Sequence, residues 1–285
     1  MKGIRDLRAG QVFHRAQLRA AGLSGRAIAA AVRSGTIIRG RRDHYVLPAS
    51  DPHLIEAVIV GGVMGCTSAL QAAGVFVGDS TRCHIHVAPH ASRLRRATSR
   101  PRNEAEPVIH WDETRWRGAT SAAVSLSDAL AKSLQCQSRW ESVATFDSAL
   151  HLGLVSRRRV EAILRTVAPP YRDLGALLDP RAESGPESIL RMIVTEAGLR
   201  TRLQVTFPGV GRVDMVVEGC VVVEADSRLA HDGWEHHVRD RGRDLALARL
   251  GMPSLRPSYQ HIMHAPGDVA AAVVELVRTV RGNAR

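Results

Sequence analysis

The sequence predicts an α+β protein of several domains, on three observations. Its 285 residues, 45% of them hydrophobic, are enough to bury more than one core. Stretches with helical periodicity occur together with short β-prone runs rich in β-branched residues. A proline-rich segment at 167–186 breaks the pattern and indicates a late domain boundary. We expect three domains, at 1–50, 51–180 and 181–285.

The charge of the chain predicts a polyanionic partner. The net charge is +11 and the pI is near 10.7, so nucleic acid is the first candidate partner and an acidic membrane surface the second. No apolar run reaches the roughly 18 to 20 residues that a membrane helix needs, and the first residues, MKGIRDLRAGQVF, lack the apolar region of a signal peptide. We expect a cytoplasmic protein that binds DNA and no membrane.

The cysteines and histidines do not predict a metal site. No C-x-x-C pair occurs among the four cysteines, which are Cys66, Cys83, Cys136 and Cys220. This argues against structural zinc and against a disulfide framework, and it favours a reducing compartment. His84, His86 and His90 follow one another in or near a predicted strand without a carboxylate or cysteine at ligand spacing, so we interpret them as a surface face.

The segment from Val12 to Pro48 predicts a winged helix. Ser24 is a suitable N-cap, apolar residues follow it at helical spacing, and Gly35 can end the helix in a left-handed turn. Two β-prone runs, 36–39 and 44–47, flank the basic tip GRRD and predict a hairpin. Helix, turn, helix and hairpin follow one another in the order of a winged helix.

This segment predicts DNA binding. Arg26 and Arg33 lie off the apolar stripe of the second helix, where they could enter a major groove while the hairpin tip contacts phosphates. The arginines that we expect to contact DNA are Arg26, Arg33, Arg39, Arg41 and Arg42. The alternative is a small helical domain with a solvated basic face.

The region 51–180 predicts an α/β linking domain to which we assign no chemistry. The apolar stretch 53–74 predicts helix against helix, with glycines that permit a close approach or a turn. The runs CHIHVAP and PVIHW predict two paired strands. Three helices are expected after them, at 126–134, 140–150 and 156–167.

The run GRVDMVVEGCVVVEAD predicts a hairpin that carries carboxylates. A reversal at 218–219 would place Asp214 opposite Glu224 and Arg212 opposite Asp226, all on one face. A shift of the register by one residue would separate the two carboxylates onto opposite faces.

Two carboxylates that lie opposite one another on neighbouring strands predict a bound cation between them. Like charges repel, and burial would raise the pKa of at least one group unless positive charge lies between them. Mg²⁺ or Mn²⁺ at Asp214 and Glu224 would supply that charge, activate a water and stabilise a phosphodiester under attack. The alternative is that Asp214 and Asp226 cap strand ends and pair with nearby arginines, Arg212, Arg228 or Arg239.

Helices are expected on both sides of this hairpin. The run SGPESILRMIVTEAG predicts one, in which Ser184 and Glu187 fit a capping box. The run 229–251 predicts the other, and MPSLRPS a short strand after it. Together these elements predict a small α/β domain.

Three stretches of this segment carry a resemblance to a known family: ESGPESILRMIV, GRVDMVVEGCVVVEADSRLAHD and RDRGRDLALARLGMPSLR. They look like the small endonuclease-like domains related to the very-short-patch repair endonuclease, in the PD-(D/E)XK superfamily, over about the last third of the chain. The resemblance implies a restriction-endonuclease-like α/β fold. With its N-terminal segment, the chain is similar to a common actinobacterial two-part protein in which an AbiEi-type antitoxin winged helix precedes such a domain.

The resemblance also implies roles for individual residues. Asp214 and Glu224 would be metal ligands, supported by Glu187 and Asp226, while the active face would be lined by His231, Arg243, Asp244 and Arg256. The superfamily usually has a lysine where Asp226 stands; this family tolerates an aspartate there, usually followed by glycine, but this chain has Ser227. His231 or His237 would then act as general base.

These observations leave more than one function open. The first hypothesis is a Mg²⁺-dependent DNA endonuclease or nickase of the very-short-patch-repair-like type. The second is a transcriptional regulator of antitoxin type, with a catalytically degenerate nuclease fold, whose partners would be operator DNA and a toxin. An RNA-processing protein would fit the charge equally well.

Overall fold

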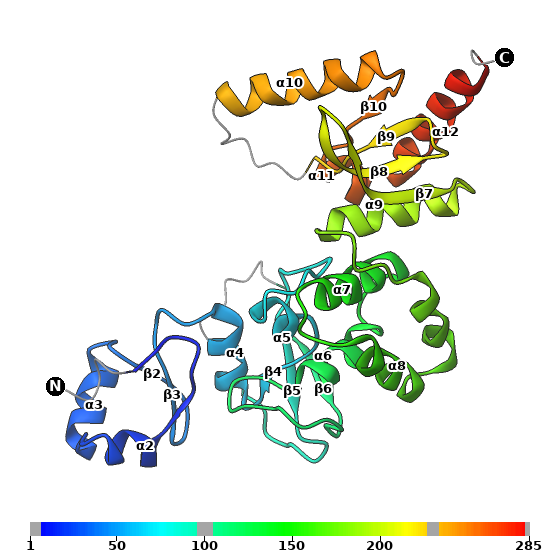
Figure 1. Ribbon diagram of the computed structural model, residues 1–285. Helices are drawn as coiled ribbons and strands as arrows, with labels where there is room; N and C mark the ends of the chain where they lie inside the picture. The colour runs from blue at the N-terminus through cyan, green and yellow to red at the C-terminus, as the bar shows by residue number, and fades with distance from the viewer. Residues whose placement is uncertain (1–6, 96–104, 227–233, 283–285) are drawn as a thin grey trace. The chain divides into compact units, whose positions relative to one another are not determined.

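The computed structural model describes residues 7–95, 105–226 and 234–282 (Figure 1). Of the side chains at 234–240, it describes only the one at 238. These residues form helices and three small sheets, with strand orders β1-β3-β2, β4-β5-β6 and β10-β9-β8-β7. The predicted mixture of helices and strands is confirmed. No helix among the described residues has the length and apolar character needed to cross a bilayer.

The chain divides into two compact units. The first unit consists of Met1–Gln137 and Arg158–Arg172, and the second of Ser138–Arg157 and Asp173–Arg285. We describe each unit by itself. The three domains expected from the sequence stay a prediction.

The first elements of the first unit follow the predicted order. They are β1 (Phe13–His14), α2 (Arg15–Ala20), α3 (Gly25–Arg33), β2 (Ile38–Arg41) and β3 (His44–Val46). The Ser24 hydroxyl caps α3 by accepting a hydrogen bond from the Ala27 N–H at 3.1 Å, and Gly35 follows the helix at φ 71°. Their shared core consists of Phe13, Leu18, Leu23, Ile28, Ala31, Ile37 and Tyr45. The predicted helix and hairpin are therefore confirmed as elements.

The rest of the first unit contains a second small sheet and the helices around it. Its elements are α4 (Pro52–Val60), β4 (Val63–Met64), α5 (Cys66–Ala72), β5 (His84–Val87), β6 (Val108–Trp111), α6 (Leu126–Ser133) and α8 (Arg157–Thr166). β5 pairs with β6 in parallel and with β4 antiparallel, so the predicted pairing of the two longer strands is confirmed.

Strand β4 was not predicted, because it lies inside an apolar run that we assigned to helices. The chain leaves α4 through Gly61, at φ 113°, and then passes so close to β5 that a Cβ on Gly62 would lie 2.3 Å from the His86 carbonyl oxygen. Two glycines thus replace a continuous helix by a turn and a short strand.

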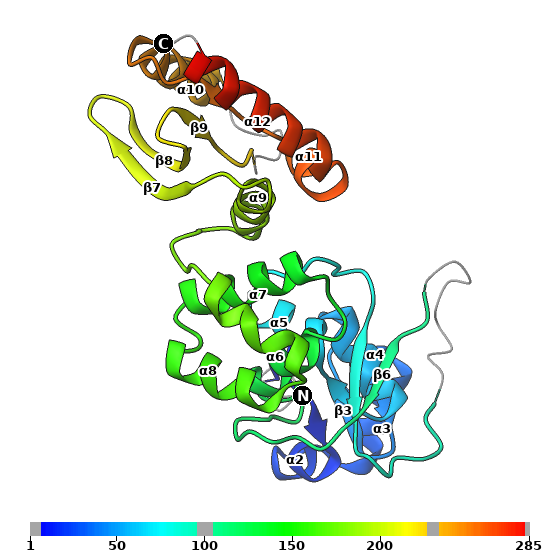
Figure 2. The same ribbon diagram turned by 90° about the vertical axis from the view of Figure 1, so that its right-hand side faces the viewer.

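The second unit is a four-stranded sheet with helices packed against it (Figures 1 and 2). Its elements are α7 (Arg139–His151), α9 (Gly185–Glu196), β7 (Thr201–Phe207), β8 (Gly211–Val217), β9 (Val221–Val223), α10 (Trp234–Arg249), β10 (Ser254–Leu255), α11 (Tyr259–His264) and α12 (Pro266–Gly282), and a 3₁₀ segment, η1 (Pro169–Leu177), precedes α9. Leu247 of α10 packs with Val213, Val216 and Val222 of the sheet. Helices α9 and α12 contact other parts of the sheet.

The hairpin of β8 and β9 has the predicted turn and register. Met215 lies opposite Val223 and Val217 lies opposite Val221. The turn residues Glu218 and Gly219 have φ 50° and 73°, as the two central residues of a type I′ turn require. The continuation of this register sets Asp214 opposite Glu224.

A buried ion pair joins α7 to α9. Asp147 is 0% exposed and accepts hydrogen bonds from Arg191 at 2.9 Å, from the Ser188 hydroxyl at 3.0 Å and from the Asp179 N–H at 2.7 Å. Burial raises the pKa of Asp147, while the charge of Arg191 lowers it. The sequence had predicted α7 as a helix without assigned chemistry; the structure gives it a buried charge that α9 and the Asp179 N–H satisfy.

Candidate functional site

Three carboxylates of the second unit interact electrostatically: Glu187 of α9, Asp214 of β8 and Glu224, which follows β9. We call them the carboxylate cluster. Burial, followed by the charges of Glu187 and Glu224, raises the pKa of Asp214 to about 7, although the Ala225 N–H donates to its Oδ2 at 2.9 Å. Near neutral pH, ionisation of Asp214 therefore costs free energy, because the group is buried and two negative charges act on it.

Glu187 both caps α9 and faces Asp214. Its carboxylate accepts from the Glu183 N–H at 2.9 Å and from the Ser184 hydroxyl at 2.8 Å, and the Ser184 hydroxyl accepts from the Glu187 N–H at 3.4 Å. The sequence offered these two roles as alternatives. The structure shows that Glu187 caps the start of the helix and that its charge also raises the pKa of Asp214.

Gln204 is a member of this site that the sequence reasoning missed. Its amide donates to Glu187 Oε2 at 3.0 Å. Gln204 has φ 52° within β7, where the pairing with β8 skips one residue between Leu203 and Val205. An irregularity of this kind redirects a side chain, and strained backbone gathers at functional sites. Only the backbone conformation reveals it, because a glutamine in a strand carries no motif.

Two arginines hold Glu224. Arg243 of α10 donates to Glu224 Oε1 at 2.8 Å, and Arg256, just after β10, donates to Oε2 at 2.9 Å. Arg256 also forms an ion pair with Asp244 at 2.9 Å. The structure therefore brings together the arginines and the aspartate that the resemblance implied. Both oxygens of Glu224 face positive charge, although the side chain is only 9% exposed.

The remaining predicted residues of this site lie at its margin. Asp226 is exposed, and its backbone N–H donates to the Pro257 carbonyl at 3.1 Å. Arg212, expected opposite Asp226, pairs instead with Glu183 at 2.7 Å. His231, predicted as a base, lies outside the described residues, as does Ser227, and the side chain of His237 is not described.

The arginines predicted to contact DNA lie in the first unit. Arg26, Arg33, Arg39 and Arg42 are exposed on α3, on β2 and at the hairpin tip. Arg41 is half-buried; it donates to the Gly61 carbonyl, and burial lowers its pKa, so its charge is directed into the unit.

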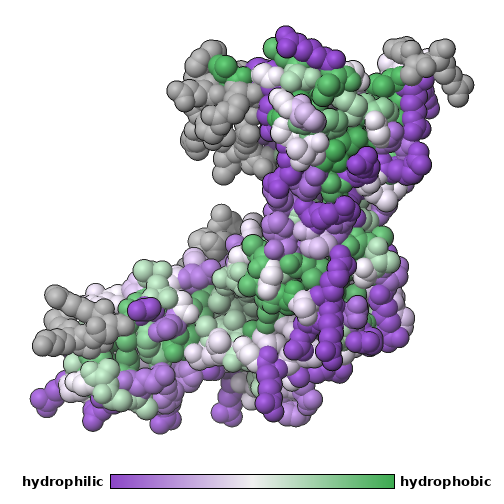
Figure 3. Space-filling view, viewed as in Figure 1, coloured by the Kyte–Doolittle hydropathy of each residue, from purple (hydrophilic) through white to green (hydrophobic). Residues whose placement is uncertain are grey.

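The surrounding surface is strongly basic. Residues 7–50 contain eight arginines and a single carboxylate, that of Asp43. Figure 3 shows hydrophilic side chains projecting along the margin formed by α2. This stretch of the chain can approach a polyanion with little opposing charge.

A second candidate site lies deeper in the first unit. Cys66, His84, His110 and Cys136 each offer one ligand atom, and these atoms all lie within 4.8 Å of one another. We call this group the Cys2His2 cluster. Cys66 and both histidines are buried, whereas Cys136 is exposed. The cluster could hold a metal ion.

The sequence interpretation missed this grouping of possible metal ligands. It rested on the absence of a C-x-x-C pair and of a cysteine near the histidines along the chain. The fold supplies the proximity instead, since Cys66 begins α5, His84 begins β5, His110 lies in β6 and Cys136 follows α6. Of the three histidines that we considered together, only His84 belongs to the cluster.

The two thiols of the cluster share a hydrogen bond. This bond, together with burial, raises the pKa of Cys66, and the same bond lowers the pKa of Cys136 to about 3. His110 and His84 also hydrogen-bond Cys136 and lower its pKa further. At neutral pH the pair therefore holds a thiolate, which is the form of cysteine that binds metals.

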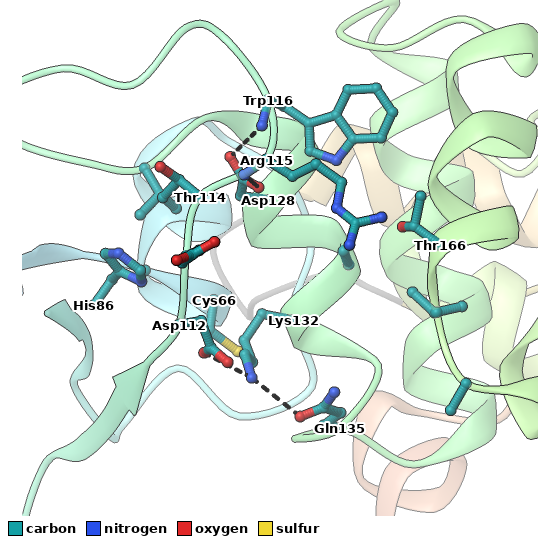
Figure 4. Close-up of a pocket in the computed structure, with 16 residues that line it drawn as sticks. Cys66, His86, Asp112, Thr114, Arg115, Trp116, Asp128, Lys132, Gln135 and Thr166 are labelled. Atoms are coloured by element: carbon teal, nitrogen blue, oxygen red, sulfur yellow. Dashed lines mark hydrogen bonds and ion pairs between the residues drawn. The ribbon is translucent and has the colours of Figure 1, made fainter. Parts of the chain in front are cut away.

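A cavity of about 230 Å³ opens beside the cluster, and Cys66 forms part of its wall (Figure 4). Lys132 crosses it to pair with Asp112 at 2.7 Å, and His86 also lines it. Cys66 lines this cavity although it is only 1% exposed.

Comparison with protein-family models, with curated proteins and with solved structures finds no match to this chain. Its function is therefore argued from its own residues.

Proposed function

We propose that this protein is a DNA endonuclease or nickase that uses a divalent cation, Mg²⁺ or Mn²⁺, in its second unit. The observation that carries the proposal is the pKa of Asp214, which burial and the charges of Glu187 and Glu224 raise to about 7. Perturbed carboxylates gather at catalytic sites more often than elsewhere. The resemblance to nucleases related to very-short-patch repair supports the same residues.

The residues of the carboxylate cluster fit a hard cation. Asp214 offers oxygen atoms at a point of excess negative charge, which a cation would neutralise. Asp214 would hold the ion and Glu187, fixed by Gln204, would orient a water or a ligand beside it. A bound divalent cation supplies charge stabilisation to a phosphodiester and lowers the pKa of a water.

The arginines beside the cluster fit the substrate of such an enzyme. Arg243 and Arg256 are each half-buried and present planar guanidinium groups next to Glu224. Guanidinium groups bind phosphate oxygens in pairs, so these side chains can hold a DNA backbone against the carboxylates.

The N-terminal part of the first unit would supply affinity for DNA. The order β1, α2, α3, β2 and β3, with one antiparallel sheet, supports the winged-helix interpretation. The exposed arginines of α3 and of the hairpin tip would contact the groove and the phosphates. We assign this part to the AbiEi type on the resemblance, and the protein to the cytoplasm.

A specific observation favours a second function. Both oxygens of Glu224 are held by arginines, and Asp226 stands where related nucleases have a lysine. If Glu224 does not leave these partners, the site lacks its second metal ligand. The protein would then be an antitoxin-type regulator that binds operator DNA and cuts nothing.

A nicking assay separates the two functions. Supercoiled plasmid and short mismatched duplexes are incubated with the full chain in Mg²⁺, Mn²⁺ or EDTA. We expect nicking that needs the metal and disappears in Asp214→Asn and in Glu224→Gln. The matched control is Glu275→Gln, which removes an exposed carboxylate of α12 outside the cluster and should leave nicking unchanged.

DNA binding and cleavage by the same preparations show which outcome would contradict the proposal. Tight binding of a DNA duplex without cleavage in either metal would overturn the endonuclease and favour the regulator. Cleavage that survives Asp214→Asn would show that another nuclease is present in the preparation.

A further inference from the structure

The Cys2His2 cluster has the spacing of a tetrahedral metal site. His84 Nδ1 lies 3.2 Å from His110 Nε2, and Cys136 Sγ lies 4.0 Å from the same nitrogen. Around a zinc ion, with Zn–N of about 2.0 to 2.1 Å and Zn–S of about 2.3 Å, two nitrogens lie about 3.3 Å apart and a nitrogen and a sulfur about 3.6 Å apart. These two distances are within a few tenths of an ångström of the tetrahedral values, and all four donor atoms lie within 4.8 Å of one another.

The donor set selects the metal. Two thiolates and two imidazoles are soft and borderline ligands, which suit Zn²⁺ and disfavour the Mg²⁺ expected at the carboxylate cluster. Two thiolates also cancel the charge of one Zn²⁺, so the complex is neutral where Cys66, His84 and His110 are buried. An uncompensated charge at this depth would be costly.

The backbone at Cys66 points to the same conclusion. Cys66 has φ 47°, a left-handed conformation that side chains other than glycine adopt rarely, and it is the first residue of α5. Strain of this kind persists where the surroundings require it. Here it places the thiol against the other three donors.

All four positions of the tetrahedron come from the protein, which is the pattern of a structural site rather than a catalytic one. The donors come from the start of α5, from β5, from β6 and from the turn after α6, where the Cys136 N–H donates to the Ser133 carbonyl at 3.0 Å. An ion held by them would join four segments of the first unit that are far apart in the sequence.

We propose that Cys66, His84, His110 and Cys136 bind one structural Zn²⁺ that fastens the sheet β4-β5-β6 to the helices α5 and α6. The ion would add a link between strands of only two to four residues and the helices beside them. This site is independent of the proposed nuclease function, which concerns the second unit.

The test measures metal in the full chain. Protein is purified without chelator, or refolded with Zn²⁺, and its metal content is determined by mass spectrometry. We expect one zinc per chain, held through dialysis, and loss of that zinc in Cys136→Ser and in His110→Ala. Cys136 is exposed, so Cys136→Ser should fold even if the buried variants do not.

Matched controls remove the same side chains elsewhere. Cys220→Ser removes a thiol of the second unit, and His86→Ala removes a histidine of β5 that faces the adjacent cavity. Both should keep one zinc per chain. Zinc lost in His86→Ala but kept in His110→Ala would overturn the ligand set.

Cobalt gives a second readout. Co²⁺ in place of zinc should produce the strong visible bands of a tetrahedral site together with a sulfur-to-metal charge-transfer band, and both should disappear in Cys136→Ser. Wild-type protein that takes up neither metal would overturn the proposal. So would a disulfide between Cys66 and Cys136 in a non-reduced peptide map of protein purified in the presence of zinc, which would make the pair a redox element instead.

Discussion

At the scale of single residues, the carboxylate cluster shows how burial and neighbouring negative charges raise the pKa of one carboxyl group. The pKa of Asp214 rises to about 7 from an ordinary value of 3.8, through burial and the charges of Glu187 and Glu224. Arg243 and Arg256 form ion pairs with Glu224, whereas at Asp214 the charge of Arg243 lowers the pKa less than burial raises it.

The first prediction concerns the stability of the second unit as a function of pH. The folded pKa of Asp214 lies above its unfolded value, so its contribution to stability is fully present below about pH 4 and is lost as the pH rises through 7. Asp214→Asn removes this penalty and should raise the free energy of unfolding at pH 8 by on the order of 3 kcal/mol, with little effect at pH 4. Urea denaturation at both pH values measures it.

Two further arms complete this experiment. Mg²⁺ at pH 8 should stabilise the wild type, by favouring ionised Asp214, and should not stabilise Asp214→Asn. The exposed control Glu275→Gln should show no pH-dependent difference from wild type. An Asp214→Asn chain that is less stable than wild type at pH 8 would contradict the inference that ionised Asp214 destabilises the folded state.

At the scale of elements, α3 and the β2–β3 hairpin separate arginines that face solvent from one that does not. Arg26 and Arg33 lie seven residues apart on α3 and are both exposed. Arg41 is directed to the carbonyl of Gly61, where it connects β2 to the end of α4. The sequence treated these arginines as equivalent; the structure leaves Arg26, Arg33, Arg39 and Arg42 exposed and packs Arg41 against the end of α4.

The second prediction is that the exposed pair binds phosphates. In Arg26→Ala/Arg33→Ala, the affinity for duplex DNA should fall and the slope of log K against log salt should decrease by about two. The matched control is Arg158→Ala/Arg165→Ala, which removes two exposed arginines of α8 at the same spacing. Fluorescence anisotropy over a salt series measures both slopes.

The comparison with Arg158→Ala/Arg165→Ala separates a specific DNA-binding face from a general effect of net charge. An equal loss of slope in both double variants would show that only the net charge matters and would contradict a DNA-binding face on α3. Arg41→Ala should instead lower the unfolding temperature of the first unit.

At the scale of the whole molecule, the chain forms two compact units with separate cores. One core lies around Phe13, Ile28 and Tyr45, and the other around Val213, Val222 and Leu247. Each unit also contains a buried polar group that other segments of the same unit must satisfy, the Cys2His2 cluster in the first and Asp147 in the second. We expect the units to unfold separately.

The third prediction is that calorimetry of the full chain resolves two transitions. Asp147→Ala leaves Arg191 buried without its carboxylate and should cost the second unit about 3 to 5 kcal/mol. It should lower one transition only. Removal of zinc, or Cys136→Ser, should lower the other. A single transition that both changes move would contradict two independent units.

The sequence by itself determined the local elements and the register of one hairpin. Ser24 caps a helix because its hydroxyl reaches the free N–H groups of its own first turn, and the chain reverses at Glu218–Gly219, where glycine adopts the required positive φ without strain. These are interactions between neighbours in the chain. They also sufficed to place Asp214 opposite Glu224.

Only the tertiary structure decided which distant side chains meet. The Cys2His2 cluster takes its donors from four separate elements, and the partners of Glu224 come from α10 and from the residue after β10. No periodicity or spacing in the sequence predicts these contacts between distant side chains, because they depend on how sheets and helices pack. The sequence could therefore name the carboxylates of the second unit, but it missed the Cys2His2 cluster of the first.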